Sequence, residues 1–267
     1  MYLEFYNFIE MPFNITPDPR FLYYSKHHKE AYDHLMYGIT QRKGFIELTG
    51  EVGSGKTTLC RAVLSSLEDD VQTALILNPS LNETQLLRAM LNDFGLEATS
   101  RDHLAYIECL NDFLLTQYRA GINVAILIDE AQNLSPQVME QVRLLSNLET
   151  DQHKLIQIVL CGQPELQQRL KRPDLRQLRQ RITVRYNLPT LTVEETGEYI
   201  QHRINVAGPQ SQVTFSSSAV KAIYRYTRGC PRMINAVCDN ALLSGYVSGV
   251  NKISPNDVKR AIRQLEG

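Results

Sequence analysis

The stretch Gly50-Glu51-Val52-Gly53-Ser54-Gly55-Lys56-Thr57 has the pattern G-x-x-x-x-G-K-[ST], and it decides the fold of this chain. The apolar segment 45–49 directly before it predicts a buried strand, and segment 56–67 predicts a helix. A glycine loop between a strand and a helix can wrap backbone N–H groups around phosphate oxygens at the positive end of the helix dipole. The sequence therefore predicts a phosphate-binding loop, with a glycine turn that binds nothing as the alternative.

Length and composition set broad limits on the protein. The 267 residues suffice for one large domain, or for a core domain and a smaller one. With 28 Lys+Arg against 29 Asp+Glu, global charge points to neither a nucleic-acid nor a membrane partner. The 5 cysteines show no C-x-x-C spacing, so we expect neither a disulfide framework nor a zinc site. Without a signal-peptide pattern or an apolar run of about 18 residues, we expect a soluble, cytoplasmic chain.

Apolar runs and helical periodicity alternate from residue 44 to about residue 188. The predicted strands are 45–49, 73–78, 124–128, 155–161 and 183–188. The predicted helices are 56–67, 83–94, 104–120, 136–148 and 164–170. Strands that alternate with helices, and that are apolar throughout, are typical of a parallel sheet covered on both faces. We therefore predict an α/β fold for this part of the chain.

The two ends of the chain follow other patterns. After Pro189 we predict helices only, at 193–206, 217–226, 232–248 and 255–265. The first 42 residues begin as an extended, aromatic-rich arm with prolines at 12, 17 and 19, followed by a helix at 29–39. We expect most of its aromatic side chains to pack in a core; the alternative is that part of the arm covers a nucleotide base. The predicted parts are 1–43 (arm and helix), 44–189 (α/β core) and 190–267 (helical domain).

A second motif completes a hydrolytic site. The apolar segment 125–128 ends in Asp129 and Glu130, the pattern of a Walker B strand. Asp129 would hold magnesium, and Glu130 would polarise a water for attack on the γ-phosphate. Taken alone, the pair could also be a solvated acidic turn. Because the sequence has neither an Asn-Lys-x-Asp guanine signature nor a Leu-Ser-Gly-Gly-Gln stretch, we expect ATP rather than GTP and no transporter-type cassette.

Three further elements carry polar groups toward such a site. Gln163 follows the apolar segment 156–161, where it could touch the attacking water, or serve only as a turn residue. The run 169–185 has seven basic residues and one acid; it could be a solvated helix face, a source of arginines for a neighbouring subunit's ATP, or a surface for phosphate backbones. Arg232, at a helix start after Pro231, could reach a bound phosphate or lie on the surface.

These elements, in this order, resemble the AAA+ ATPases, and more narrowly the ExeA/GspA-type ATPases of bacterial type II secretion. The narrower resemblance rests on Phe5-Tyr6-x-Phe8, Pro12-Phe13-Asn14-x-Thr16-Pro17-Asp18-Pro19, Asp129-Glu130-Ala131-Gln132, Gly162-Gln163-Pro164-Glu165-Leu166 and Gly229-Cys230-Pro231-Arg232-Met233-Ile234-Asn235. It covers nearly the whole chain. It implies a P-loop NTPase (AAA+) parallel sheet flanked by helices, with a small all-α C-terminal lid domain.

The resemblance also implies a role for each matching residue. ATP would be held by Gly50, Glu51, Val52, Gly53, Ser54, Gly55, Lys56, Thr57, Thr58 and Arg232, the last as sensor 2, and Mg2+ by Thr57 and Asp129. The catalytic set would be Glu130 as the base, Lys56, Gln163 as sensor 1, and Arg181 as the finger acting on a neighbour's ATP, with Arg179 in reserve. Such a finger makes hydrolysis depend on a homo-oligomer, a ring or a filament.

Three functions follow as hypotheses. The first is an ATPase that drives assembly of a secretion or pilus-type envelope machine; the second is an ATP-dependent, DNA-binding regulator of transposition, as in close cousins with the same core. The third is a nucleotide-gated scaffold with negligible turnover. Longer secretion members continue into a membrane span and a peptidoglycan-binding domain, neither of which this sequence contains. We therefore expect either the cytoplasmic part of an inner-membrane protein or a short relative.

Overall fold

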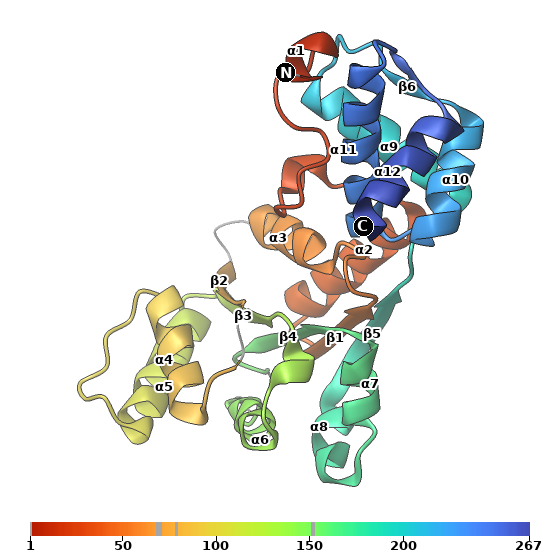
Figure 1. Ribbon diagram of the computed structural model, residues 1–267. Coiled ribbons are helices and arrows are strands. Elements are labelled where there is room, and N and C mark those ends of the chain that lie inside the picture. The colour runs from red at the N-terminus through yellow and green to blue at the C-terminus, as the bar shows by residue number, and fades with distance from the viewer. Residues whose placement is uncertain (1, 68–70, 78–79, 151–152) are drawn as a thin grey trace. The chain divides into compact units, whose positions relative to one another are not determined.

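The computed structural model describes residues 2–67, 71–77, 80–150 and 153–267, which form two compact units (Figure 1). Unit 1 contains the chain up to His28, Glu51–Thr58 and Pro189–Gly267, and unit 2 contains Lys29–Gly50 and Leu59–Leu188. The units thus group the start of the chain and the glycine loop with the C-terminal helices. The sequence predicted three parts, with boundaries after residues 43 and 189, and this domain division remains a prediction.

Unit 2 is built on a five-stranded parallel sheet in the order β2-β3-β4-β1-β5. Its strands are β1 (Phe45–Gly50), β2 (Val71–Ile76), β3 (Asn123–Ile128), β4 (Gln157–Gly162) and β5 (Ile182–Leu188). Every residue of β1, β3 and β4 is buried, because these central strands are covered on both faces. The edge strand β5 alternates instead between buried and more exposed positions. The predicted α/β class is confirmed, and β4 lies between β1 and β3.

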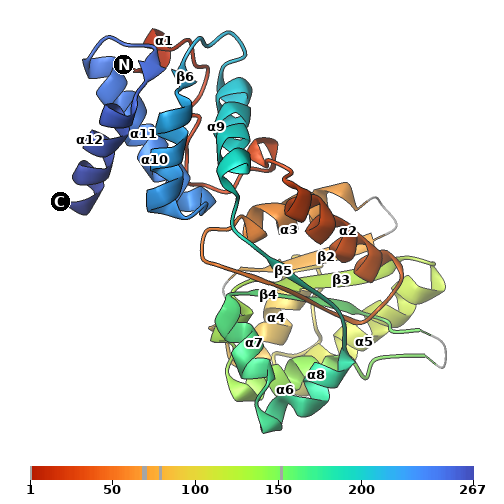
Figure 2. The same ribbon diagram turned by 90° about the vertical axis from the view of Figure 1, so that its right-hand side faces the viewer.

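Helices cover both faces of this sheet. Figure 2 shows α2 and α3 on one face and α4 to α8 on the other. Their bounds are α2 (Lys26–Thr40), α3 (Lys56–Ser66), α4 (Glu83–Asp93), α5 (His103–Arg119), α6 (Pro136–Leu145), α7 (Pro164–Leu170) and α8 (Arg176–Arg181), with short 3-10 turns η2 (Ala131–Asn133) and η3 (Pro173–Leu175). The main core lies between the sheet and the helices of the second group. Side chains cap three of these helices at their starts: Asn82, Asp102 and Ser135.

Several predicted elements needed correction in unit 2. The strand expected at 73–78 is β2, which begins at Val71 and ends at Ile76; Asn78 lies outside the described residues. The strand expected from 155 begins at Gln157, since Leu155 and Ile156 are buried in the core without joining the sheet. A run of apolar residues indicates which residues are buried, and buried residues can continue beyond the end of a strand. The short elements η2 and α8 were not predicted, because neither is long enough to show a helical period.

Unit 1 is mainly helical. Its helices are α1 (Tyr2–Phe5), α9 (Val193–Ala207), α10 (Ser217–Thr227), α11 (Pro231–Val247) and α12 (Pro255–Glu266), with a 3-10 turn η1 (Pro19–Phe21). The prediction of helices only after Pro189 was wrong, because β6 (Thr214–Phe215) and β7 (Lys252–Ile253) form a small parallel sheet. Two residues are too few to alternate visibly. In the part of the chain that the structure describes, no helix is long and apolar enough to cross a membrane.

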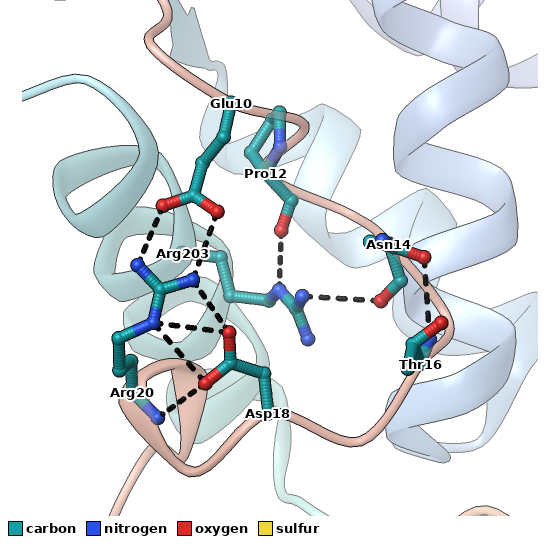
Figure 3. Close-up of polar contacts among 7 residues, drawn as sticks. All are labelled: Glu10, Pro12, Asn14, Thr16, Asp18, Arg20 and Arg203. Carbon is teal, nitrogen blue, oxygen red and sulfur yellow. Dashed lines mark hydrogen bonds and ion pairs between the residues drawn. The ribbon is translucent and has the colours of Figure 1, made fainter.

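The N-terminal arm packs on α9 to α12, and its first residues form α1 rather than the extended chain predicted. Tyr6, Phe8, Phe13 and Phe21 are buried in the second core, which confirms core packing for these aromatic side chains. Arg203 of α9 holds the arm: its guanidinium donates to the carbonyl oxygens of Pro12 and Asn14 (Figure 3). Coverage of a nucleotide base by the arm remains a prediction.

Candidate functional site

The glycine loop follows β1 and leads into α3, as the sequence predicted. Gly53 and Gly55 have φ angles of 76° and 97°, in the left-handed region that favours glycine. Both sites are crowded: a Cβ on Gly53 would clash with the Cβ of Arg232 at 2.5 Å, and one on Gly55 would make a tight contact of 3.2 Å with Nε2 of His28. The loop therefore has the backbone that the phosphate-binding pattern requires.

Polar groups inside the loop fit an anionic ligand. Lys56 is buried, and its ammonium donates to the carbonyl oxygen of Glu51 at 2.9 Å. Ser54 is 1% exposed, and its hydroxyl has no hydrogen-bond partner among the described residues. A buried hydroxyl beside the start of α3, with its positive dipole end, has hydrogen-bonding capacity that a phosphate oxygen would satisfy.

His28 contacts the glycine loop, and the sequence did not predict this contact. Its Nδ1 lies 2.8 Å from the Ser25 hydroxyl and its Nε2 lies 3.1 Å from the carbonyl oxygen of Ser54. A carbonyl can only accept, so Nε2 carries the proton and Nδ1 accepts from the Ser25 hydroxyl. Burial lowers the pKa of His28 from its usual range, since it disfavours the charged imidazolium. The neutral ring therefore donates a hydrogen bond that holds the backbone of the glycine loop at Ser54.

The start of α11 contacts the same loop within unit 1. The thiol of Cys230 donates to the carbonyl oxygen of Val52 at 3.2 Å, and the backbone N–H of Arg232 donates to that of Gly53 at 3.2 Å. Pro231 occupies the first turn of the helix, as predicted. The Arg232 side chain is exposed, so its predicted role as sensor 2 remains a prediction.

Asp129 and Glu130 stand directly after β3. Asp129 is 4% exposed, and its Oδ1 accepts the backbone N–H of Glu130 at 2.9 Å. The chain turns at this point, and Glu130 takes a φ of 52°, a conformation uncommon for a residue other than glycine. The turn directs the chain from β3 into η2, and it sets where the Glu130 carboxylate lies.

The structure brings Glu130 and Gln163 together. Because β4 pairs with β3, the end of β4 lies beside the end of β3, and Gln163 Nε2 donates to Glu130 Oε2 at 2.9 Å. Gln163 is also the N-cap residue of α7, although its side chain makes no capping hydrogen bond. Gln163 therefore lies directly after the strand that pairs with β3, at the end of that strand as expected, and its role as sensor 1 remains a prediction.

Several arginines of the basic run 169–185 make contacts within unit 2. Arg169 donates to the carbonyl oxygens of Gln132 and Leu134, and Arg181 donates to the hydroxyl of Ser146. Arg185 pairs with Glu47 of β1 at 3.3 Å. Arg179 and Arg181 lie in the last turn of α8 and are both half-buried. Several of these side chains thus serve the fold of unit 2, which a count of charges along the sequence could not show.

Known proteins are similar to this chain in sequence and in fold. Residues 39–170 match the AAA domain family. General secretion pathway protein A of Aeromonas hydrophila is 45% identical over 268 residues, an alignment that covers 100% of this chain and 49% of that protein. The chain therefore spans about half the length of this curated relative.

Two solved structures show the same fold at low sequence identity. The ORC2 protein of Aeropyrum pernix, in its ADPNP–ADP complexes, has a TM-score of 0.70 at 16% identity, over 95% of this chain and 71% of its own. CDC6P of Pyrobaculum aerophilum has a TM-score of 0.69 at 18% identity, over 93% and 71%. The fold is that of a P-loop AAA+ ATPase with a helical C-terminal region. Within that class, the chain belongs to the ExeA/GspA-type AAA ATPases.

Proposed function

We propose that this chain binds ATP with Mg2+ and hydrolyses it by attack of a water molecule. The observation that carries the proposal is the Glu130 carboxylate, held by Gln163 at the end of β3, in a chain with a complete glycine loop. A carboxylate fixed in this way can take the proton of the attacking water, and an amide next to it can orient the γ-phosphate or that water.

The loop residues would bind the nucleotide. In this proposal the backbone N–H groups from Gly50 to Thr58 would surround the phosphates, and Lys56 would extend to the β- and γ-phosphates. The Thr57 hydroxyl and the Asp129 carboxylate would hold Mg2+, which neutralises charge on the phosphates during transfer. Three observations support this assignment: the positive φ angles of the two loop glycines, the buried Lys56, and the Ser54 hydroxyl, which has no hydrogen-bond partner within the described part of the chain.

Arginines would complete the site from outside. In this proposal Arg232 contacts phosphate as sensor 2, and Arg181, with Arg179 as the reserve, contacts the ATP of a neighbouring copy in a homo-oligomer. Arg181 ends α8 directly before the edge strand β5. To reach a neighbouring copy, its guanidinium would have to leave the Ser146 hydroxyl and the Arg143 carbonyl oxygen. We also propose a cellular role for this chain. The name of the Aeromonas relative refers to general secretion, and in this proposal the chain drives assembly of a secretion or pilus-type machine.

The test of hydrolysis compares Glu130→Gln with the parent chain. We expect unchanged ATP affinity and a loss in kcat of about 10²- to 10⁴-fold, the range for removal of a general base. Glu165→Gln is the matched control, because Glu165 is an exposed carboxylate at the start of α7. A parent rate no higher than that of Glu130→Gln would refute hydrolysis and favour the nucleotide-gated scaffold.

Mixing two inactive variants tests the shared site. Arg181→Ala lacks the finger and Glu130→Gln lacks the base, so each alone should be inactive. In a mixed oligomer, an Arg181→Ala copy receives an intact finger from its neighbour, and hydrolysis should return. If activity does not return at any mixing ratio while both variants still co-assemble, Arg181 does not act on a neighbour's ATP.

A further inference from the structure

The Gln132 amide makes hydrogen bonds both to the candidate base, Glu130, and to the backbone of Gln163. Its Nε2 donates to Oε2 of Glu130, and its Oε1 accepts the backbone N–H of Gln163 at 3.1 Å. The orientation of this amide is fixed by chemistry, because a backbone N–H can only donate and must face the oxygen. The NH2 group is thereby turned toward Glu130, two residues earlier in the chain.

The two amides leave the Glu130 carboxylate with one oxygen for water. Gln132 and Gln163 both donate to Oε2. In the part of the chain that the structure describes, neither amide reaches Oε1. Two donors on one oxygen fix the plane and rotation of a carboxylate, and they leave the lone pairs of the other oxygen available to accept a proton.

The surroundings of Gln132 hold it in this place. A Cβ on Gly162, the last residue of β4, would lie 2.8 Å from Oε1 of Gln132, so only glycine leaves room for the amide. On its other side, the backbone carbonyl of Gln132 accepts from the guanidinium of Arg169. The turn η2 is also anchored by Ala131, which is 0% exposed. Gln132, within the turn after β3, is therefore held by hydrogen bonds to Gln163 at the start of α7 and to Arg169.

We propose that Gln132 is a positioning residue for hydrolysis: it holds Glu130 so that Oε1 faces the attacking water, and it ties that carboxylate to the start of α7. The inference rests on the proposed function, in which Glu130 is the base. Gln132 itself would touch neither ATP nor water, so its removal should leave nucleotide binding intact. Misplacement of a reacting group by about 1 Å can cost about 10²-fold in rate.

The first test replaces Gln132 with methionine, which keeps the length of the side chain and removes both hydrogen bonds. In the chain of 267 residues, we expect an unchanged ATP dissociation constant and a fall in kcat of about 10- to 100-fold. Gln168→Met is the matched control, because Gln168 is an exposed glutamine on α7. An unchanged kcat in Gln132→Met would overturn the inference.

The second variant, Gln132→Glu, gives a readout that a structural role alone would not move. A second carboxylate beside Glu130 disfavours ionisation of the pair, so the rise of kcat with pH should shift to higher pH. The same pH profile as the parent, in a variant that binds ATP, would contradict a contact with the base.

These experiments distinguish failure of the positioning role of Gln132 from failure of the proposed hydrolysis. If Glu130→Gln abolishes hydrolysis and both Gln132 variants match the parent, only the positioning role fails; if the parent shows no hydrolysis, the proposed function fails.

Discussion

Arg203 should contribute far more to stability than its neighbour Arg20, although Arg20 makes the ion pairs. Arg203 is 6% exposed; it donates to the carbonyl oxygens of Pro12 and Asn14 and to the Tyr199 hydroxyl. Its guanidinium lies 4.7 Å from the centre of the Phe21 ring. Arg20 pairs with Glu10 and Asp18, but its side chain is 63% exposed (Figure 3).

The magnitude for Arg203→Met follows from the groups left behind. The Asn14 carbonyl keeps a donor, Nδ2 of Asn235 at 3.3 Å, whereas the Pro12 carbonyl loses the donor that Arg203 supplies. An unsatisfied buried acceptor costs about 1 to 3 kcal/mol, and the lost contact with Phe21 adds about 0.5 to 2 kcal/mol. Relief of the buried charge offsets part of this loss. We expect the free energy of unfolding to fall by about 2 to 4 kcal/mol.

The assay is urea unfolding followed by far-UV circular dichroism, since the chain contains no tryptophan. Arg20→Met is the control, and we expect it to lose no more than about 1 kcal/mol, as exposed ion pairs do. The two variants should share the urea dependence of the parent, so that the shift in midpoint reports stability alone. Equal losses for the two variants, or a loss under about 1 kcal/mol for Arg203→Met, would refute the argument.

Two further predictions concern Tyr6 and His28. The one proton of the buried Tyr6 hydroxyl is shared between the carbonyl oxygens of Leu242 and Val250, both at 3.1 Å. Tyr6→Phe should therefore lower the free energy of unfolding by about 1 to 2 kcal/mol in the same assay, and no measurable change would contradict this. Burial lowers the pKa of His28, so below about pH 6.5 the unfolded chain takes up a proton that the folded chain does not. The parent should therefore lose stability relative to His28→Gln between about pH 7 and pH 5, and parallel pH profiles would count against the buried neutral ring.

The candidate site was only partly predictable from sequence. Lys56, Asp129 and Glu130 stand out because the loop and the strand end that carry them are local patterns. Gln163 stands out as a polar residue after an apolar segment, but only the pairing of β4 with β3 places it beside Glu130. The roles of these residues remain predictions. Gln132 stands out from the sequence only within the stretch Asp129-Glu130-Ala131-Gln132, because a glutamine in a turn carries no signal of its own. Its contact with Gln163 joins positions 31 residues apart.

The sequence by itself determined the parallel sheet, the glycine loop and most of the helices, because apolar runs, helical periods and glycine positions act over a few neighbouring residues. Only the tertiary structure decided that β4 enters between β1 and β3, that His28 supports the loop carbonyl of Ser54, and that Gln132 and Gln163 hold one oxygen of Glu130. These contacts form between segments far apart in the chain. Their energies depend on burial and on hydrogen-bond geometry, which exist only once the sheet and its helices have packed.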